Sequence, residues 1–291
     1  MHDGDKLHRF TLDGSAVRGE LVQLDESWQG LLARADYPLN LKRLLGEALA
    51  ATALMAATLK MSGGGLTLQV SGGDGPVSLL VIQAKADGGL RGMAKWRDEV
   101  PEASLDKLFG AQAQMVMTID PGEGQEQYQG VVELQGQGLA DALQTYFIRS
   151  EQLPTRFWLC ADEEGVAGLL LQRLAGADAE DESWQRAVHL AATVKPVELL
   201  QLPAVEVLHR LFHEEEVRLF EPQAQRFACS CSQQRSENML RSLGLNELRQ
   251  LLLQEPEVAI TCEFCSARYA FDVVDVEALF SDSHEGDLSH H

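Results

Sequence analysis

Four of the five cysteines lie close together near the C-terminal end of the chain. Cys229 and Cys231 form a C-x-C motif, and Cys262 and Cys265 form a C-x-x-C motif further along. Thiols at these spacings are typical of three kinds of chemistry: a closed metal site, a pair of disulfides, or a dithiol active site. Together the two motifs most resemble a pair of zinc-binding knuckles that meet in space.

The residues around the second motif disfavour a dithiol active site. A thioredoxin-like C-x-x-C opens a helix that follows a strand. The segment after Cys265, SARYAFDVVD, has instead the pattern of a strand, and the C-x-C motif would be left without a role. One irregularity of the zinc interpretation is Ser266, because a knuckle often has glycine at this position to permit a left-handed turn.

The same four sulfur atoms cannot bind a metal and form disulfides at once. Each sulfur would lie about 2.3 Å from Zn²⁺, and the sulfurs would then be farther apart than the roughly 2.05 Å of a disulfide bond. The thiols within each motif are close enough in sequence to couple. A disulfide between residues i and i+2 closes a small, strained loop that is readily reduced. This pattern favours a reversible switch over a permanent cross-link.

The chain is strongly acidic, which argues against a nucleic-acid partner. It has 44 acidic and 24 basic residues and a net charge of −20. Residues 221–291 contain twelve acidic residues and five arginines, a net charge of −7. Phosphate binding requires clustered Lys and Arg, so we expect no DNA or RNA partner.

The apolar segments do not indicate a membrane protein. The N-terminal MHDGDKLHRF is acidic and lacks the apolar core of a secretory signal. The most apolar stretch, residues 48–59, is shorter than the ~20 residues of a spanning helix. We therefore expect a soluble cytoplasmic protein with no membrane partner. In that compartment thiols are kept reduced, so clustered cysteines favour metal or redox chemistry.

The hydrophobic pattern predicts an α+β fold with a largely antiparallel sheet. Apolar residues spaced three and four apart over residues 41–59 describe one face of a buried helix. Alternating or continuous apolar runs predict strands at 66–70, 77–84, 114–120, 128–136 and 155–162. The glycines of residues 71–76 indicate a hairpin turn, and a second helix is expected over residues 139–152.

The pattern changes after the small, acidic stretch at residues 176–183, which predicts a boundary. Helical segments broken by Pro196 and Pro203 follow. We therefore predict an N-terminal α+β domain (1–178), a helical linker (179–226) and a small C-terminal zinc domain with four cysteine ligands (227–291). A core of about 70 residues supplies only ~3–5 kcal/mol, whereas a structural zinc supplies ~10–16 kcal/mol. Loss of the metal should therefore unfold the third segment and loosen the helices before it.

Other candidate residues have simpler explanations. His209 and His213 have the spacing of zinc ligands on a protease helix, but Arg210 occupies the position of the general base, so we expect an ordinary helix surface. The glycine clusters are not followed by a Gly-Lys-Ser/Thr, which excludes a phosphate loop of that kind. Cys160, after RFWL, is expected to be a buried apolar residue.

Several segments together resemble the redox-regulated 33-kDa heat-shock chaperone family of bacteria. They include the C-x-C and C-x-x-C motifs, AVRGELV at 16–22, GDGPVSLLVI at 73–82 and YFIRSEQLPT at 146–155. The segment LPAVEVLHRLFHEEEVRLFEPQ before the first cysteine pair matches as well. The resemblance covers essentially the whole chain, and Cys160 belongs to none of these motifs.

This resemblance implies an ATP-independent holdase chaperone and not an enzyme. It implies that one Zn²⁺ is bound in the reduced, inactive form by four cysteines, Cys229, Cys231, Cys262 and Cys265. Oxidation is then expected to form the disulfides Cys229–Cys231 and Cys262–Cys265, release the zinc, destabilise the linker and give an active homodimer. The implied partners are unfolding client proteins, which are later passed to ATP-dependent chaperones in a stress response.

Two functions of other classes remain as alternatives. A dithiol–disulfide oxidoreductase would turn over in an insulin-reduction assay and would require only the C-x-x-C motif. A constitutive zinc-stabilised interaction module would bind its partner better with zinc than without it. The chaperone interpretation predicts the opposite dependence on zinc.

Overall fold

The computed structural model describes residues 4–59, 63–122, 124–134, 136–176 and 182–281. The chain divides into two compact units, residues 1–228 and residues 229–291. Each unit has its own hydrophobic core, and each is described by itself.

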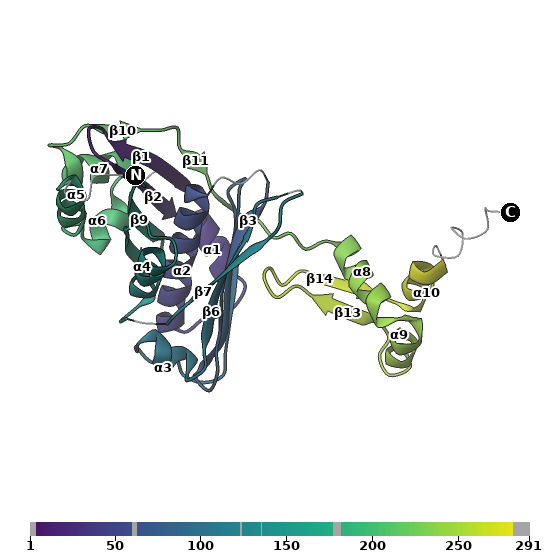
Figure 1. The fold of residues 1–291 in the computed structure, drawn as a ribbon. Helices are drawn as coiled ribbons and strands as arrows, with labels where there is room; N and C mark the ends of the chain where they lie inside the picture. Colours follow the sequence, from purple (N-terminus) through teal and green to yellow (C-terminus); the bar gives the residue numbers. More distant parts are fainter. Residues whose placement is uncertain (1–3, 60–62, 123, 135, 177–181, 282–291) are drawn as a thin grey trace. The chain divides into compact units, whose positions relative to one another are not determined.

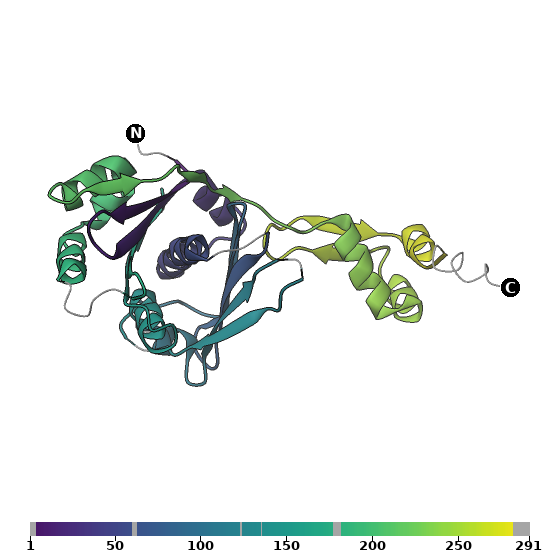
Figure 2. The same ribbon diagram turned by 45° about the horizontal axis from the view of Figure 1, so that its top comes forward.

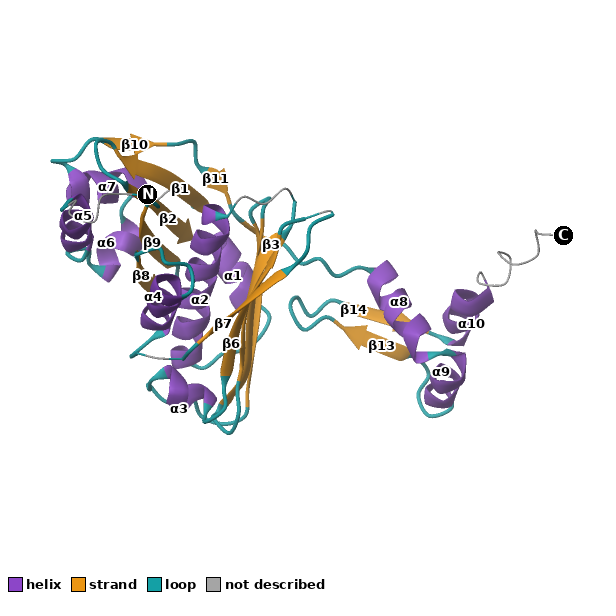
Figure 3. Ribbon diagram, viewed as in Figure 1, coloured by secondary structure: helices purple, strands orange, loops and turns teal. Residues whose placement is uncertain are grey.

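The first sheet of the N-terminal unit has the strand order β10-β1-β2-β9-β8, and β11 also pairs with β1 (Figures 1 and 3). All of its strand pairs are antiparallel. Its long strands are β1 (Lys6–Leu12), β2 (Val17–Leu24), β8 (Thr155–Ala161) and β9 (Val166–Arg173). The short ones are β10 (Val217–Leu219) and β11 (Gln223–Ala224).

The second sheet of this unit has the order β12-β5-β4-β3-β6-β7. Its strands are antiparallel apart from the short parallel pair between β12 and β5. They are β3 (Gly65–Ser71), β4 (Val77–Lys85), β5 (Gly89–Trp96), β6 (Gln114–Asp120), β7 (Tyr128–Val132) and β12 (Arg226–Phe227). The glycine-rich turn before Val77 joins β3 to β4, as predicted.

Helix α2 (Leu39–Thr58) lies between the two sheets and builds the main core (Figure 2). The predicted face is buried from Leu41 to Met55, but the interior of the helix is buried on its other sides as well, for example at Leu49 and Leu54. The prediction of a buried helix is therefore confirmed. A helix that is covered all round needs small and apolar residues on every side, which explains its many alanines.

Short helices surround this two-sheet arrangement. Helices α5 (Ser183–Ala191), α6 (Pro196–Gln201) and α7 (Ala204–Phe212) form a second core with the face of the first sheet that points away from α2. Pro196 starts α6 and Pro203 caps α7, which confirms the predicted breaks. The remaining helices of this unit are α1 (Glu26–Leu32), α3 (Leu105–Phe109) and α4 (Leu139–Arg149).

The segment after α7 runs along the edges of both sheets. Residues 217–219 and 223–224 pair with β1, and residues 226–227 pair with β5. The Arg226 guanidinium donates to the carbonyl oxygen of Asp87 at 2.7 Å and forms an ion pair with its carboxylate at 2.5 Å. Residues 217–227 are called the edge segment below. Its strands were not predicted, because each is too short to show a periodic pattern.

The C-terminal unit is a hairpin with three helices. Strands β13 (Val258–Thr261) and β14 (Arg268–Phe271) form the hairpin, and α8 (Gln233–Leu243), α9 (Leu245–Leu252) and α10 (Val273–Ser281) pack with it. The fully buried part of its core is small: Leu240, Leu248, Phe271, Val276 and Leu279. A core of this size supplies little stability without an additional constraint.

The predicted fold class is confirmed: helices are mixed with antiparallel sheets, and a small cysteine-containing unit follows. The predicted boundary at 176–183 falls largely outside the described residues. The described helices between Ser183 and Phe212 pack within the first unit, so a separate linker at 179–226 stays a prediction. Among the described residues, no helix is both long and apolar enough to cross a membrane.

One glutamate in the first sheet is buried almost completely. Glu20 on β2 is 3% exposed and lies opposite Arg9 on β1 and Leu170 on β9. Burial raises the pKa of this carboxyl to about 7, although Arg18 and Arg9 oppose the shift. The folded chain therefore holds a proton on Glu20 over a pH range in which the unfolded chain has lost it.

This burial predicts a pH-dependent stability. Because the folded-state pKa of Glu20 is raised, the free energy of unfolding should fall as pH rises from about 4.5 to 7. Glu20→Gln should therefore stabilise the protein at pH 8, by up to roughly 3 kcal/mol, and should have little effect near pH 4.5. Melting temperatures across this range check it, with the exposed Glu102→Gln as the control. Equal shifts at both pH values would contradict the prediction.

Candidate metal centre

The four cysteine sulfurs of the C-terminal unit form one cluster. The sulfur atoms of Cys229, Cys231, Cys262 and Cys265 all lie within 4.8 Å of one another. Two close approaches join the two motifs: Cys229 Sγ lies 3.6 Å from Cys262 Sγ, and Cys231 Sγ lies 3.2 Å from Cys265 Sγ. All four residues are half-buried. The structure thus brings together the residues that the sequence singled out.

The C-x-C motif is held in place by the start of α8. Ser232 directly follows Cys231 and caps this helix by accepting a hydrogen bond from the N–H of Arg235 at 3.2 Å. The Arg235 guanidinium also donates to the carbonyl and hydroxyl oxygens of Ser230, at 2.7 and 2.8 Å. The positive end of the α8 dipole and the Arg235 charge therefore lie beside the motif, where they favour negative sulfur.

The C-x-x-C motif forms the turn between β13 and β14. The N–H of Cys262 donates to the carbonyl oxygen of Ala267 at 2.9 Å. The N–H of Ser266 donates to the carbonyl oxygen of Cys262 at 2.8 Å. The backbone N–H groups of Phe264 and Cys265 point at the Cys262 sulfur, and that of Ala267 points at the Cys265 sulfur. Such N–H groups stabilise thiolates, as in a zinc-binding knuckle.

Ser266 adopts the left-handed backbone conformation that its position requires. Its φ is +58°, in the region where glycine is favoured and a Cβ atom is strained. The irregularity noted in the sequence is therefore a real feature of the fold: a serine occupies a glycine-type position.

The thiols of this turn are weak acids as long as no cation is near them. Burial raises the pKa of Cys262, and the N–H groups of Phe264 and Cys265 only partly oppose this. Burial, together with the neighbouring sulfurs, raises the pKa of Cys265 to about 12, against the opposing N–H of Ala267. A cation must therefore displace protons from the cluster to bind, so binding should strengthen as pH rises.

The cluster fits a tetrahedral metal ion. Four sulfurs at about 2.3 Å from one metal are about 3.8 Å apart from each other. The separations found here, from 3.2 Å up to the 4.8 Å limit, span that value. Four thiolates form a closed, soft ligand set, which suits Zn²⁺. The residues that could hold the ion are thus the four predicted cysteines, Cys229, Cys231, Cys262 and Cys265.

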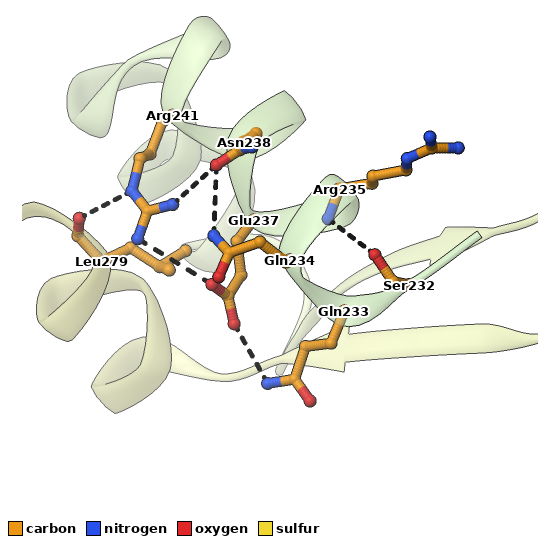
Figure 4. A network of polar contacts seen from close by, with 8 residues as sticks. All are labelled: Ser232, Gln233, Gln234, Arg235, Glu237, Asn238, Arg241 and Leu279. Carbon is orange, nitrogen blue, oxygen red and sulfur yellow. Dashed lines mark hydrogen bonds and ion pairs between the residues drawn. The ribbon is translucent and has the colours of Figure 1, made fainter. Parts of the chain in front are cut away.

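Polar contacts tie α8, which begins just after the C-x-C motif, to the rest of the unit (Figure 4). Arg241 on α8 donates to the carbonyl oxygen of Leu279 on α10 at 3.2 Å and to the side-chain oxygen of Asn238 at 3.0 Å. Arg249 on α9 makes a two-bond ion pair with Glu277 on α10, at 2.6 and 2.7 Å. The pairs that involve exposed side chains are individually weak, so the small core and the cluster must hold the unit together.

The predicted disulfides are not formed in this structure. All five cysteines are free thiols, and two close sulfur pairs join different motifs. In a metal-binding arrangement each sulfur is about equally distant from the other three. The closest pair therefore does not select a disulfide, and Cys229–Cys231 and Cys262–Cys265 stay predictions.

The structure separates the other candidates from this cluster. Cys160 lies in the N-terminal unit on β8, half-buried against the second core, and its sulfur is 3.7 Å from the carbonyl oxygen of Ala167. Burial raises the pKa of its thiol to about 12, which makes it unreactive. His209 and His213 lie exposed on α7 and just after it, as the surface interpretation predicted.

Two residues that act on the cluster, Arg235 and Tyr269, were not predicted from the sequence. The Tyr269 hydroxyl lies 3.3 Å from Cys231 Sγ, and this contact raises the pKa of the tyrosine to about 12. The available signal was the alternation of the strand after the C-x-x-C motif, which places Tyr269 on the same side as the buried Phe271. Arg235 gave no comparable signal, because its role depends on where α8 begins.

Comparison with known proteins gives one consistent result. The family model described as "Hsp33 protein" matches residues 5–272. The "33 kDa chaperonin" of Nitrosococcus oceani is 47% identical over 282 residues, which cover 97% of this chain and 96% of that protein. The protein of the same name from Shewanella denitrificans is 48% identical over 280 residues, 96% of each chain.

A solved structure gives the same fold. The crystal structure of the 33 kDa chaperonin (heat shock protein 33 homolog) from Thermotoga maritima matches with a TM-score of 0.80. The match covers 96% of this chain and 99% of that one, at 23% sequence identity.

The conformation of Ser266 predicts that glycine stabilises the metal-bound turn. Ser266→Gly removes the left-handed strain but makes the unfolded chain more flexible. The net effect should raise the free energy of unfolding by about 1 kcal/mol. The guanidinium concentration at which the metal leaves the protein should rise. Ser266→Ala is the matched control, because alanine also lacks the hydroxyl but keeps the strain. A similar gain in both variants would contradict this explanation.

The small core predicts that the C-terminal unit depends on its metal. After chelation, backbone amides of residues 229–281 should lose most of their protection from hydrogen exchange, since the remaining core is near the limit of stability. Amides of β2 and β9 should keep theirs. The measurement is hydrogen exchange followed by mass spectrometry, and retained protection in β13 and β14 would refute the dependence.

Proposed function

This chain belongs to the Hsp33 family, and from that premise we propose that it is a redox-regulated, ATP-independent chaperone. The observation that carries the proposal is the single cluster of four half-buried sulfurs in a unit whose own core is small. Such a unit has two stable conditions for its sulfurs, metal-bound and oxidised, and only the first preserves the fold.

In the reduced protein the cluster would be the ligand set of Zn²⁺. The ion would supply the positive charge that keeps the four sulfurs as thiolates. The chain's own contribution is to aim the N–H groups of Phe264, Cys265 and Ala267, and the N-terminal end of α8, at these sulfurs. The C-terminal unit would then be folded, and the chaperone inactive.

Hydrogen peroxide would convert this ligand set into disulfides. In the first step a thiolate attacks the peroxide, an S–O bond forms and the O–O bond breaks, which gives a sulfenic acid and hydroxide. A second thiol then displaces the sulfenic oxygen, which leaves as water, and an S–S bond forms. Each disulfide consumes one peroxide and yields one water and one hydroxide, which takes a proton from solvent to give a second water. By the resemblance the products are Cys229–Cys231 and Cys262–Cys265, neither of which can ligate the metal.

The edge segment offers a route from the cluster to the N-terminal unit. The N–H of Ala228, the residue before Cys229, donates to the carbonyl oxygen of Leu90 at 2.8 Å. The strands before it, β10, β11 and β12, contribute only two or three residue pairs each. Unfolding that begins at Cys229 would therefore meet little resistance along this segment, and would continue into α7.

Release of α5, α6 and α7 would expose the apolar face that these helices cover. That face contains Phe10, Leu21, Leu169 and Leu171, each of which is less than 2% exposed now. Several adjacent exposed apolar residues of this kind would bind the exposed apolar segments of unfolding proteins. We place the clients on this surface and on the released helices. The active form would be a homodimer in the cytoplasm that passes its clients to ATP-dependent chaperones.

The geometry argues against the oxidoreductase alternative. The C-x-x-C motif lies in a hairpin turn, whereas the redox motif of a thioredoxin opens a helix. Burial also raises the pKa of Cys262 and Cys265, and an attacking cysteine needs a lowered one. We therefore propose that the protein is not an enzyme.

The proposal is tested by following zinc and chaperone activity in the same sample. Zinc-loaded protein is treated with peroxide at mildly elevated temperature, zinc release is read with a colour-forming chelator, and aggregation of a heat-denatured client by light scattering. About one equivalent of zinc should leave as aggregation is suppressed, and reductant should reverse the suppression. Cys160→Ser should behave as the unmodified chain, whereas Cys262→Ser with Cys265→Ser should not respond to peroxide. Equal protection by the reduced, zinc-loaded protein would refute the switch.

A further inference from the structure

Tyr269 is a side chain outside the two cysteine motifs that touches the cluster. It lies on β14, opposite Ile260 on β13, and its ring packs against the core of the C-terminal unit. Its hydroxyl group lies 3.3 Å from Cys231 Sγ, within hydrogen-bonding distance for sulfur. A phenol donates its proton to a thiolate, so the contact is a hydrogen bond whose acceptor is the sulfur.

This bond crosses between the two motifs. Cys231 belongs to the C-x-C motif before α8, whereas Tyr269 follows the C-x-x-C motif on the hairpin. The Cys262 and Cys265 sulfurs receive backbone N–H groups from within their own turn. For Cys231 the donor comes from a side chain, and a side chain can be changed without altering the backbone.

We propose that Tyr269 is a positioning residue of the cluster, and that its hydroxyl lowers the reactivity of Cys231 and so sets how much oxidant the switch requires. A hydrogen bond draws electron density from the sulfur lone pair, which makes the sulfur a weaker nucleophile toward the O–O bond of peroxide. The same bond fixes the direction of the sulfur toward the metal. The proposal rests on the proposed function, because it concerns the same four sulfurs.

The hydrogen bond has two separable consequences. Bonds to metal ligands from neighbouring groups commonly change metal affinity by about 10- to 100-fold. Removal of the hydroxyl should therefore weaken zinc binding, on the order of tenfold, and increase the rate of reaction with peroxide. If the role of Tyr269 were only structural, Tyr269→Phe would change neither the zinc affinity nor the peroxide rate. The reason is that Phe fills the same space in the core and the unit stays folded.

The test is Tyr269→Phe in the full-length, zinc-loaded chain. Tyr128→Phe is the matched control, because it removes a half-exposed hydroxyl from the N-terminal unit. Zinc affinity is measured by competition with a chelator, and the second-order rate of zinc release by peroxide is measured under excess oxidant. Tyr269→Phe should bind zinc about tenfold more weakly and release it several-fold faster under peroxide, with the control unchanged.

A spectroscopic measurement separates the hydrogen bond from a loss of folding. With Co²⁺ in place of zinc, the thiolate-to-cobalt charge-transfer band should move to lower energy in Tyr269→Phe, since the sulfur lone pair is no longer stabilised. Hydrogen exchange of residues 229–281 in the zinc-loaded variant should match that of the unmodified chain.

The outcomes distinguish this inference from the proposed function. If Tyr269→Phe keeps the same zinc affinity, peroxide rate and cobalt spectrum, or if Tyr128→Phe changes them equally, the role of Tyr269 is refuted. If peroxide fails to release zinc from the unmodified chain, the proposed switch is refuted first. If peroxide releases zinc from the unmodified chain and from Tyr269→Phe at the same rate, the proposed switch stands and only the role of Tyr269 is refuted.

Discussion

The C-terminal unit depends on one constraint: four sulfur atoms are held within 4.8 Å of one another. As thiolates they would repel one another strongly, and as thiols they gain little from being close. Only a central cation or covalent coupling makes so tight a group favourable. The hairpin turn, the start of α8 and the side chains that touch the sulfurs are all arranged around this requirement, and the small core adds little to it.

The N-terminal unit is built on a different principle. Its stability comes from a helix enclosed between two sheets, with Trp28, Leu41 and Leu45 fully buried in the shared core. Three further helices cover the outer face of the first sheet. One chain thus joins a unit with a large enclosed core to a unit whose own core is small. Under the proposed function, a change in the cysteines would unfold the small unit while the larger core persists.

Sequence reasoning could find the elements with a regular pattern and the residues with distinctive chemistry. Residues 66–70 and 77–84 alternate or run apolar, so their strands were predictable, and the four cysteines needed only their spacing. The strands at residues 6–12, 17–24, 89–96 and 166–173 escaped prediction. The pairing of residues 226–227 with β5 depends on a partner distant in sequence. Tyr269 was missed for the same reason, since its contact with Cys231 exists only once the hairpin and α8 have met.

The edge segment has a consequence for solubility. Its short strands now cover β1 and β5, which are the long strands at one end of each sheet. Any process that removes the segment leaves a row of unpaired N–H and C=O groups on both sheets, and such edges readily pair with other chains, including further copies of the same one. A net charge of −20 makes copies of this protein repel one another while still permitting contact with less acidic chains. The acidity that argued against a nucleic-acid partner thus also opposes the growth of assemblies larger than the proposed homodimer.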